Sequence, residues 1–481
     1  MPFNGFDMNA PSALADPPAA PTSSASYKWL VILMLWFICF FNYADRQTIS
    51  AVFPELEREF GFNKEQLGLI GSAFMWAYAG CALVAGLVCD RFRRKDLILG
   101  GCLFWSFITM LTGWCSKLWQ FVVVRGLEGF GETFYFPASM SLASDYHGPN
   151  TRSRALAFHQ SSVYVGTILG SWLGAWLAMR FGWRIGFYLF GAAGIVLSLL
   201  LYAFLREPVR GQAEVPETSL ETTAADGSPS PWAEGRGEGD RDARRPGPVY
   251  TQGGGPAPTN SLSIPAIFRL ILDSPSVILL MLAFAAANAV ATVFLVWTPS
   301  FLKDKFHYDL ATAGLSGTVF IHTASAVSVP IAGLFADRLT TRVPGGRIII
   351  QVAGLLGGAI FVFLVGSTAS QLTLVFSMTL FGFFKGFYDS GIFASMYDSI
   401  EPGARGTAAG IMNTIGWGGG AFGPWFVGWL AEHGSKPTKI ENMSTAISYG
   451  GIIYLLAAGL LLAAIPLYGK RSRSAGESLI K

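Results

Sequence analysis

Seven ionisable side chains lie inside segments that are otherwise apolar enough to cross a membrane. They are Asp45, Arg46, Arg125, Glu128, Glu132, Lys385 and Asp389. A charge at membrane depth costs roughly 2.5–3.5 kcal/mol on insertion scales, so such residues usually face a partner, a cavity or a pathway. Carboxylates in that setting can take up and release protons. Guanidinium and ammonium groups there can bind anions.

The spacing of the first five charges assigns them to helix faces. Asp45 and Arg46 are adjacent in the sequence, and successive helical residues diverge by about 100°, so these two need not pair with each other. Arg125, Glu128 and Glu132 follow an i, i+3, i+7 pattern and therefore share one face. A second interpretation stays open for all of them, because such charges can simply neutralise one another and hold helices together.

Lys385 and Asp389 lie in the corresponding segment of the second half of the chain. The run Lys385-Gly-Phe-Tyr-Asp389 aligns with Glu128-Gly-Phe-Gly-Glu132, so Asp389 takes the place of Glu132. The two residues are four positions apart, a spacing that favours an ion pair on a helix.

The segments that must position these charges are about 20 residues long, the length needed to cross the hydrocarbon core as a helix. Six lie in the first half and six in the second, which predicts an all-α membrane protein with twelve transmembrane helices in two pseudo-symmetric six-helix bundles. The predicted segments are 29–50, 66–89, 97–115, 118–144, 154–180, 184–205, 276–298, 310–336, 346–367, 371–397, 405–430 and 446–468. In the fifth segment, Gly166, Gly170 and Gly174 favour close packing against a neighbouring helix.

A short motif repeats once in each half and supports the duplication. Gly86-Leu-Val-Cys-Asp90-Arg91 follows the second apolar segment, and Gly333-Leu-Phe-Ala-Asp337-Arg338 follows the eighth. Internal repeats of this kind are common in secondary transporters. A carboxylate at a helix end beside a basic loop can hold two helices in one conformation and release them in another. We therefore predict a gating set made of Asp90, Arg91, Arg94, Asp337 and Arg338.

Composition excludes several classes of protein. Only 14% of the 481 residues are charged and 52% are hydrophobic, whereas a soluble domain carries roughly 25% charged residues. The net charge of +3 gives no support for nucleic-acid binding. The five cysteines show no metal-ligand spacing. No nucleotide-binding loop or catalytic triad pattern is present, so we expect neither an enzyme nor a bound cofactor or metal.

The chain divides into five predicted regions. They are an N-terminal tail (1–27), a six-helix bundle (28–205), a polar linker expected to be disordered (206–265), a second bundle (266–468) and a C-terminal tail (469–481). With both termini inside, Lys and Arg number 22 inside and 9 outside, in agreement with the positive-inside rule. We expect an uncleaved, monomeric protein of the bacterial cytoplasmic (inner) membrane with both termini in the cytoplasm.

The membrane portion resembles the major facilitator superfamily, through the paired Gly-xxx-Asp-Arg loops and Gly182-Trp-Arg-xx-Phe187. Within it, Asn42-Tyr-x-Asp-Arg46, the Arg125 to Glu132 run with Tyr-Phe-Pro-Ala138, and Trp297-Thr-Pro299 resemble the anion:cation symporters. That family takes up sugar acids and other organic anions together with protons. The resemblance implies the major facilitator fold, alternating access, and protons and a small anion as partners within the lipid bilayer.

The resemblance also implies roles for individual residues. Arg46 would bind the substrate carboxylate, Asp45 and Glu132 would titrate, Arg125 would partner Glu132 across two turns, and protonation of Asp45 would free Arg46. The predicted proton-coupling residues are Asp45, Glu132, Arg125 and Asp389. The predicted substrate-binding residues are Arg46, Tyr43, Gln47, Tyr135, Gln160, Asn288, Lys385, Tyr388 and Asn413. For His159 and His322, which lie within helices, both proton relay and hydrogen-bonded packing stay open.

A second family stays open as an alternative. Arg93 replaces the glycine that the loop usually carries, and this loop, together with Phe104-Trp-Ser106 and Arg152-Ser-Arg154, resembles the spinster transporters of lysophospholipids and sphingolipids. The same Asp-Arg and Glu signals occur in that group. The Pro137 and Trp297 segments favour the sugar-acid reading. A receptor built on a transporter fold is a third reading, which binding without flux would favour.

Overall fold

The computed structural model describes residues 25–210, 212–214, 269–343, 345–400 and 405–478. In these ranges the chain is almost entirely helical and no strand is present. Most of the predicted linker lies outside the described residues. The first half contains α1 (Ala25–Ala51), α2 (Phe53–Phe60), α3 (Lys64–Arg91), α4 (Arg94–Thr112), α5 (Leu118–Glu132), α6 (Tyr135–Tyr146), α7 (Pro149–Phe181), α8 (Trp183–Phe204) and a 3₁₀ turn, η1 (Gln212–Glu214).

The second half repeats this order. It contains α11 (Pro275–Phe306), α12 (Leu310–Thr340), α13 (Gly346–Ser367), α14 (Gln371–Asp389), α15 (Ile392–Ser399), α16 (Arg405–Gly420), α17 (Phe422–His433) and α18 (Lys439–Ser478). Nine of the described helices are long and apolar enough to span a bilayer alone. The other three spans are each built from two shorter helices, α5–α6, α14–α15 and α16–α17, which completes the predicted twelve. The short α2 and the polar extension of α11 beyond residue 298 were not predicted.

Proline accounts for two of the three interruptions. Pro137 is the third residue of α6 and Pro424 the third residue of α17. Proline has no N–H to donate and its ring clashes with the carbonyl four residues earlier, so each helix is broken just before it. The Gly420 carbonyl, which Pro424 leaves without its usual donor, accepts instead from the Thr292 hydroxyl at 2.6 Å.

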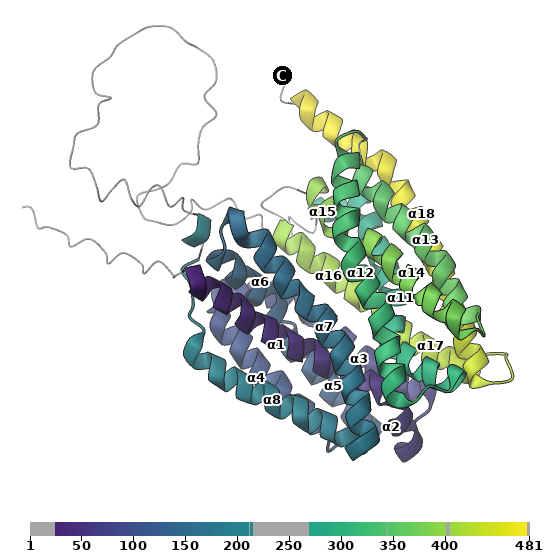
Figure 1. Cartoon of the computed structure of the whole chain (residues 1–481). Coiled ribbons are helices and arrows are strands. Elements are labelled where there is room, and N and C mark those ends of the chain that lie inside the picture. The colour runs from purple at the N-terminus through teal and green to yellow at the C-terminus, as the bar shows by residue number, and fades with distance from the viewer. Residues whose placement is uncertain (1–24, 211, 215–268, 344, 401–404, 479–481) are drawn as a thin grey trace, which may run out of the picture.

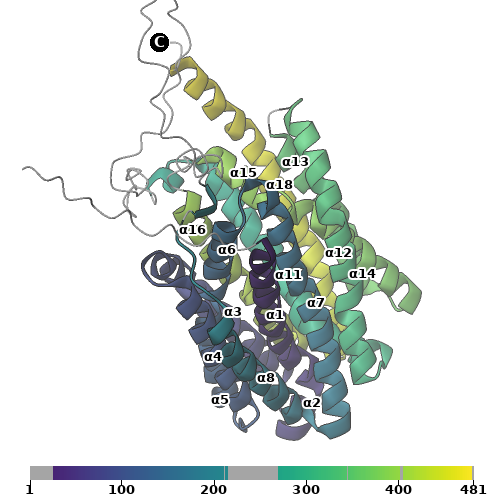
Figure 2. The same cartoon turned by 60° about the vertical axis from the view of Figure 1, so that its left-hand side comes forward.

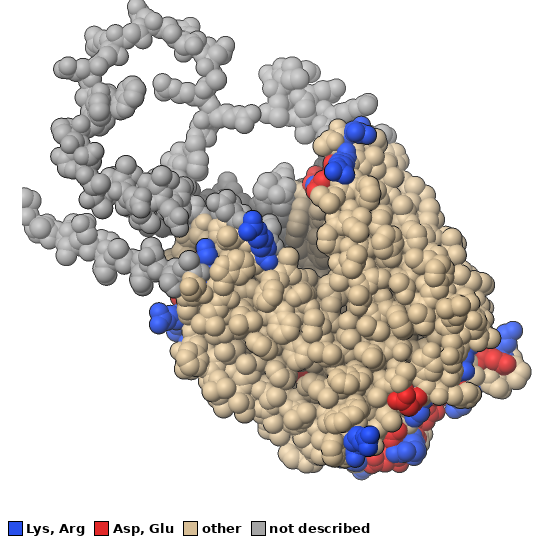
Figure 3. Space-filling model, in the orientation of Figure 1, with Lys and Arg blue, Asp and Glu red and all other residues tan. Residues whose placement is uncertain are grey.

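The helices form two groups that stand side by side, the first half in purple to teal and the second in green to yellow (Figures 1 and 2). We call the end that carries α2 the α2 face, and the opposite end, where α1 begins and α18 ends, the tail face. Charged side chains gather at these two ends and leave a broad band between them almost free of charge (Figure 3). Such a band is what a surrounding bilayer requires.

Glycines of α7 set the orientation of α1. A Cβ on Gly166 would lie 2.6 Å from the Phe40 carbonyl oxygen, and one on Gly170 would lie 2.3 Å from the Ala44 Cα. The predicted close packing of these glycines is confirmed. Because α7 lies against the Ala44 side of α1, the neighbouring Asp45 and Arg46 are turned toward the interior of the first half, where both are buried.

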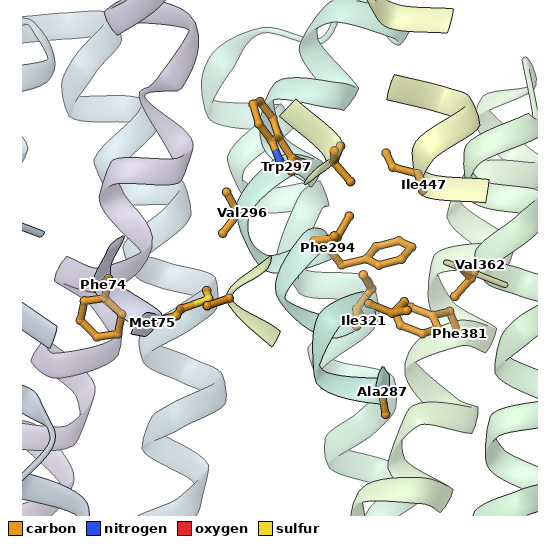
Figure 4. Close-up of a cluster of buried hydrophobic side chains, with 14 of the residues drawn as sticks. Phe74, Met75, Ala287, Phe294, Val296, Trp297, Ile321, Val362, Phe381 and Ile447 are labelled. Atoms are coloured by element: carbon orange, nitrogen blue, oxygen red, sulfur yellow. The ribbon is translucent and has the colours of Figure 1, made fainter. Parts of the chain in front are cut away.

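One hydrophobic core continues from the second half into the first. Figure 4 shows Phe294 against Phe381 within the second half, with ring centroids 4.5 Å apart. On the first-half side, Phe53 meets Trp297 edge to face at 5.6 Å. The Trp297 indole also donates to the Pro424 carbonyl at 2.8 Å, which fixes its orientation.

At the α2 face, Lys64 joins the two halves. Its ammonium donates to Asp304 of the second half and to Glu57 of the first, both at 2.7 Å. Its backbone N–H donates to Glu432 at 2.8 Å. Lys64 is only 5% exposed, whereas the side chains of Glu57 and Asp304 are 34% and 29% exposed. The α2 face is therefore closed by an ionic network centred on a buried lysine.

Three glycines bring the backbones of the two halves together near the same face. A Cβ on Gly68 would lie 2.5 Å from the Pro424 carbonyl oxygen, one on Gly428 would lie 2.3 Å from the Lys64 carbonyl oxygen, and one on Gly314 would lie 2.7 Å from the Ser171 carbonyl oxygen. No side chain fits at such distances without a shift of the backbone. Toward the tail face, a hollow separates the halves in the space-filling view (Figure 3).

Helix α2 is held to α8 by a second ion pair. Arg184 donates to the two Glu59 oxygens at 2.6 and 3.1 Å, and the Trp183 indole donates at 2.7 Å. The hydrogen bonds from Arg184 lower the pKa of Glu59 below its usual range. A lowered pKa means that the pair contributes stability above the usual carboxyl pKa and loses it only as the pH falls through the lowered value. Mild acid therefore leaves this contact intact.

Neutralising Lys64 is expected to open the α2 face. Lys64→Met removes the charge and leaves the partly exposed carboxylates of Asp304 and Glu57 without the cation that joins them, so the contact between the two halves is lost. Spin labels at the exposed positions Lys117 and Lys436, one in each half, would report the distance between the two halves by double electron–electron resonance. Arg58→Met is the matched control, because Arg58 pairs with Glu55 while 79% exposed and such pairs contribute little. Equal distance distributions in wild type and Lys64→Met would contradict the assignment.

Candidate functional site

Two buried ion pairs lie in the first half. The Arg46 guanidinium, from α1, pairs with Glu132, the last residue of α5, and its Nε lies 3.0 Å from Glu132 Oε2. Arg125 pairs with Glu128 one turn away on α5, at 2.5 Å. The prediction that Arg125 partners Glu132 is therefore wrong. Arg125 is satisfied within its own turn, and Arg46 reaches across from the neighbouring helix to take Glu132.

Asp45 has no guanidinium partner in the described part of the chain. Its Oδ1 accepts the Arg46 backbone N–H at 2.7 Å, and its Oδ2 lies 3.3 Å from the Thr109 hydroxyl. That hydroxyl has only one proton to donate and lies closer, at 3.0 Å, to the Trp105 carbonyl oxygen. Asp45 is therefore the carboxyl group of this cluster with the weakest compensation.

The cluster contains three carboxyl groups and two guanidinium groups. The nearest oxygens of Asp45, Glu128 and Glu132 lie within 4.8 Å of one another. Like charges this close disfavour full ionisation. The two arginines compensate two of the carboxylates, so a single proton makes the cluster neutral. A proton is the cation that this donor set, already occupied by two guanidiniums, can accommodate most readily.

Aromatic rings surround the Arg46 guanidinium. Its central carbon lies 4.5 Å from the ring centres of Tyr43 and Phe74 and 5.6 Å from that of Tyr78. Both Arg46 hydrogen bonds to Glu132 go to Oε2, and Glu132 Oε1, buried, has no hydrogen-bond partner among the described residues. That oxygen can accept a proton without losing an existing contact.

A central cavity of about 210 Å³ lies between the two halves. Side chains from both halves line it, most of them polar or aromatic. They are Tyr43, Gln160, Val163, Tyr164, Thr167, Asn288, Thr292, Phe294, Leu295, Ile321, His322, Phe381, Lys385, Asp389 and Trp417, with the small residues Ala291 and Gly317. Asn288 Nδ2 has no hydrogen-bond partner in the described structure and is free to donate to a ligand.

Lys385 and Asp389 form the predicted ion pair, on the cavity wall. Their side chains are 20% and 33% exposed, against 6% and 0% for Arg46 and Glu132. The pair in the second half is thus open to the cavity, whereas the pair in the first half is sealed. Arg46 itself lies one side chain back from the cavity, behind the lining residue Tyr43.

Of the nine residues predicted to bind substrate, the cavity brings together Tyr43, Gln160, Asn288 and Lys385. The other five do not line it. Arg46 is paired with Glu132. Gln47 donates to the Leu295 carbonyl at 2.6 Å, and this hydrogen bond joins α1 to α11.

Tyr135, Tyr388 and Asn413 also lie away from the cavity lining. The Tyr135 hydroxyl donates to the Leu35 carbonyl at 2.8 Å and contacts His159 at 2.9 Å, inside the first half. Tyr388 is buried within the second half. The two tyrosine side chains face the interior of a bundle. The sequence did not indicate this, because a tyrosine on a membrane helix has the same sequence signature whichever way it points. Contact of these three residues with substrate stays a prediction.

The predicted gating residues occupy the tail face, where two arginines organise them. Arg94, buried, pairs with Asp145 of α6 and Glu207. Arg347, at the start of α13, pairs with Asp337 at 3.2 Å and Asp398 of α15 at 2.5 Å.

These two networks are pseudo-equivalent, since in each an arginine near the start of a helix pairs with an aspartate of a short helix, Asp145 of α6 or Asp398 of α15. Arg91 and Arg338 are exposed, and the side chain of Asp90 lies outside the described residues. The sequence analysis missed Arg347, Asp145 and Asp398. The repeated motif could have indicated Arg347, because Arg94 and Arg347 both lie at the start of the helix that follows a copy of that motif. A gating role stays a prediction.

A sequence profile of the Major Facilitator Superfamily matches residues 35–424, and a second match covers 302–479. The chain belongs to the major facilitator superfamily. It is 29% identical over 432 residues to the chloroplastic "Probable anion transporter 4" of Oryza sativa, covering 89% of this chain and 68% of the relative. It is 25% identical over 401 residues to the "Probable galactarate/D-glucarate transporter" of Bacillus subtilis, covering 81% and 83%.

A solved structure shares the fold of this major facilitator protein. It is a bacterial homologue of the human lysosomal transporter spinster, in an inward-facing and unoccupied conformation, with a TM-score of 0.67 at 19% identity and coverage of 94% and 98%. At that identity the likeness establishes the fold alone. The predictions of a twelve-helix integral membrane transporter rather than an enzyme are confirmed.

Proposed function

We propose that the protein carries a small organic anion, such as a hexuronate or aldonate, across the membrane together with protons. The observation that supports this most directly is the buried Arg46–Glu132 pair, whose free Oε1 can take a proton. A guanidinium offers planar two-point contact to a carboxylate. Glu132 now occupies that position, so the substrate and Glu132 compete for the same cation.

The geometry changes the predicted order of events. Asp45 was expected to release Arg46 on protonation, but the residue that holds Arg46 is Glu132. Protonation of Glu132 at Oε1 weakens the pair, and the long Arg46 side chain can then reach past the Tyr43 ring into the cavity. Asp45 instead takes the proton that balances three carboxyl groups against two guanidiniums.

The charges balance in the loaded state. With Asp45 and Glu132 both protonated, Arg125–Glu128 is neutral and Arg46 alone carries a positive charge, which one substrate carboxylate cancels. A neutral assembly is the one that can be enclosed in a low-dielectric cavity without a large desolvation penalty. Loss of the proton from Glu132 restores the ion pair and expels the anion.

Alternating access fits the closure of the α2 face and the hollow at the tail face. We assign the tail face to the cytoplasm, as the distribution of Lys and Arg favours. In that orientation the structure is closed to the outside and open to the inside. The cavity would load its protons and anion after the Lys64 network opens and would release them at the tail face.

The anion-transporter relatives support an anionic substrate. The names of two relatives, from Oryza sativa and Bacillus subtilis, refer to anions and to sugar diacids. The cavity surface is mostly apolar with a few polar groups, and it suits a hydroxylated substrate because Gln160 and Asn288 can bond to hydroxyl groups and the aromatic rings can pack against a carbon chain.

The spinster-like alternative has an observation of its own. Human "Protein spinster homolog 1" is 27% identical over 359 residues, and the bacterial spinster homologue has the same fold. A lysophospholipid would place its phosphate on Arg46 or Lys385, and its acyl chain would need an apolar path. Flux of a lysolipid without sugar-acid flux would select this alternative.

Uptake into proteoliposomes tests both. Purified protein is supplied with labelled glucuronate, gluconate, glucarate or lysophosphatidylcholine, with and without an inward proton gradient. We expect a sugar acid to accumulate against its gradient and the accumulation to collapse with a protonophore. Gradient-independent flux of lysophosphatidylcholine alone would overturn the proposal.

A further inference from the structure

The two halves carry carboxylates at equivalent places, and each carboxylate holds a cation, Arg46 from α1 in the first half and Lys385 from α14 itself in the second. Glu132 is the last residue of α5 and Asp389 is the last residue of α14, and each helix is interrupted directly afterwards. Glu132 holds Arg46, and Asp389 holds Lys385. The function proposed above uses only the first pair. That function gives the Lys385–Asp389 pair no role.

The second pair is placed to meet a ligand. Lys385 and Asp389 both line the cavity and are the more exposed of the two pairs. The Arg125–Glu128 pair in the first half, by contrast, is sealed from the cavity, with 4% and 2% of the side chains exposed. The ammonium of Lys385 can therefore reach a ligand without a change of helix packing.

The two cations lie on opposite sides of the cavity, Lys385 in its lining and Arg46 one side chain behind it. Tyr43 of α1 lines one side and packs against Arg46 at 4.5 Å, whereas Lys385 of α14 lies on the second-half side. Between them lie neutral polar groups, including the unpartnered amide of Asn288 and the amide of Gln160. This arrangement suits a ligand with an anionic group at each end and hydroxyl groups in the middle.

The surroundings of the second pair add no further acid. The titratable side chains that face it from neighbouring elements in the described structure are Tyr164 of α7, His322 of α12 and Tyr454 of α18. Tyr164 and His322 pack together with ring centres 6.0 Å apart. Asp389 is thus the carboxylate that competes with a ligand for Lys385.

We propose that Lys385 binds a second carboxylate of the substrate and that Asp389 takes up a second proton, so that the preferred substrate is a polyhydroxy dicarboxylate. This rests on the proposed function, because it adds a second anion contact to the same cavity. One proton adds to Glu132 and one to Asp389, and each frees its cation for one substrate carboxylate. Two protons cross with a dianion, and no net charge moves.

The first test compares two six-carbon sugar acids, the dicarboxylate glucarate and the monocarboxylate gluconate. Exchange is measured in proteoliposomes for wild type and for Lys385→Gln/Asp389→Asn, which removes both charges of the pair together and so leaves neither one unpaired. We expect the glucarate-to-gluconate ratio of initial rates to fall at least about tenfold, as loss of a buried charge contact predicts. An unchanged ratio, with both acids exchanged by wild type, would overturn the second site.

The second test measures charge movement, which a structural role would not alter. Glucarate transport by wild type is expected to be electroneutral on a solid-supported membrane. In Asp389→Asn, Lys385 is permanently free while only Glu132 carries a proton, so each glucarate should move one net negative charge and a current should appear. A current of the same sign and size in both proteins would overturn the inference.

The two levels of failure are distinguishable. If wild type exchanges neither acid, the proposed function fails and the second site fails with it. If wild type exchanges both acids in a proton-dependent manner but the variants change neither ratio nor current, the proposed function stands and only the second site fails.

Discussion

Glu132→Gln is expected to abolish proton-driven accumulation of a monocarboxylate such as gluconate while exchange of that anion across the membrane continues. Glutamine matches glutamate in size but neither binds nor releases a proton in this range. It also cannot hold Arg46 as an ion pair, so the guanidinium is permanently available to the substrate. Accumulation under an inward proton gradient should fall to the level seen without a gradient, measured as radiolabel uptake in proteoliposomes.

The control for this variant is Glu128→Gln on the same helix. Glu128 is equally buried and also paired with an arginine, but its partner is Arg125 and the Arg46–Glu132 pair remains. Gel filtration and counterflow exchange establish that each variant is folded. Gradient-driven accumulation that survives in Glu132→Gln would remove Glu132 from the coupling mechanism.

Arg46→Ala is expected to abolish substrate binding itself. Removing one partner of a buried, hydrogen-bonded charge pair costs roughly 2–5 kcal/mol, and each 1.4 kcal/mol is tenfold in affinity. The affinity for the transported sugar acid should therefore fall at least about thirtyfold. A scintillation proximity assay with labelled substrate measures it directly in detergent.

Two further variants separate binding from folding. Arg46→Ala leaves Glu132 as an unpaired buried carboxylate, whereas Arg46→Ala/Glu132→Gln leaves no orphan charge and should fold normally yet still fail to bind. Arg46→Lys restores the charge without the planar two-point contact and should recover only part of the affinity. An affinity equal to that of wild type in the double variant would exclude Arg46 from the site.

Local spacing predicted those features that depend on a single segment. The length of each apolar run gives the twelve spans, and four-residue spacing gives the pairing of Lys385 with Asp389, which the structure confirms. The i, i+3 spacing of Arg125 and Glu128 contained the correct pair as well. Spacing alone does not choose between Glu128 and Glu132 as the partner of Arg125. All three share one helix face, and the sequence does not show which of the two carboxylates a residue of a neighbouring helix will bind.

What sequence could not predict is contact between distant segments. Arg46 and Glu132 are 86 positions apart, and their pairing depends on how far α1 is rotated about its axis, which the glycines of α7 set by contact. The orientation of Tyr135 and Tyr388 depends on the same kind of rotation. The sequence did not predict the Lys64 network, because its carboxylates come from three separate helices, α2, α11 and α17.

The closure of the α2 face combines two contacts of different physical origin. The ionic network of Lys64 is electrostatic and is lost when one of its charges is removed. The contacts of Gly68 with Pro424 and of Gly428 with Lys64 are backbone against backbone, so they are steric and do not change with pH or salt. In Gly68→Ala, the added methyl group would clash with the Pro424 carbonyl oxygen and push the two halves apart at this face. It would trap the transporter with this face open, in the state needed to see how the substrate enters, without touching any residue that binds protons or anions.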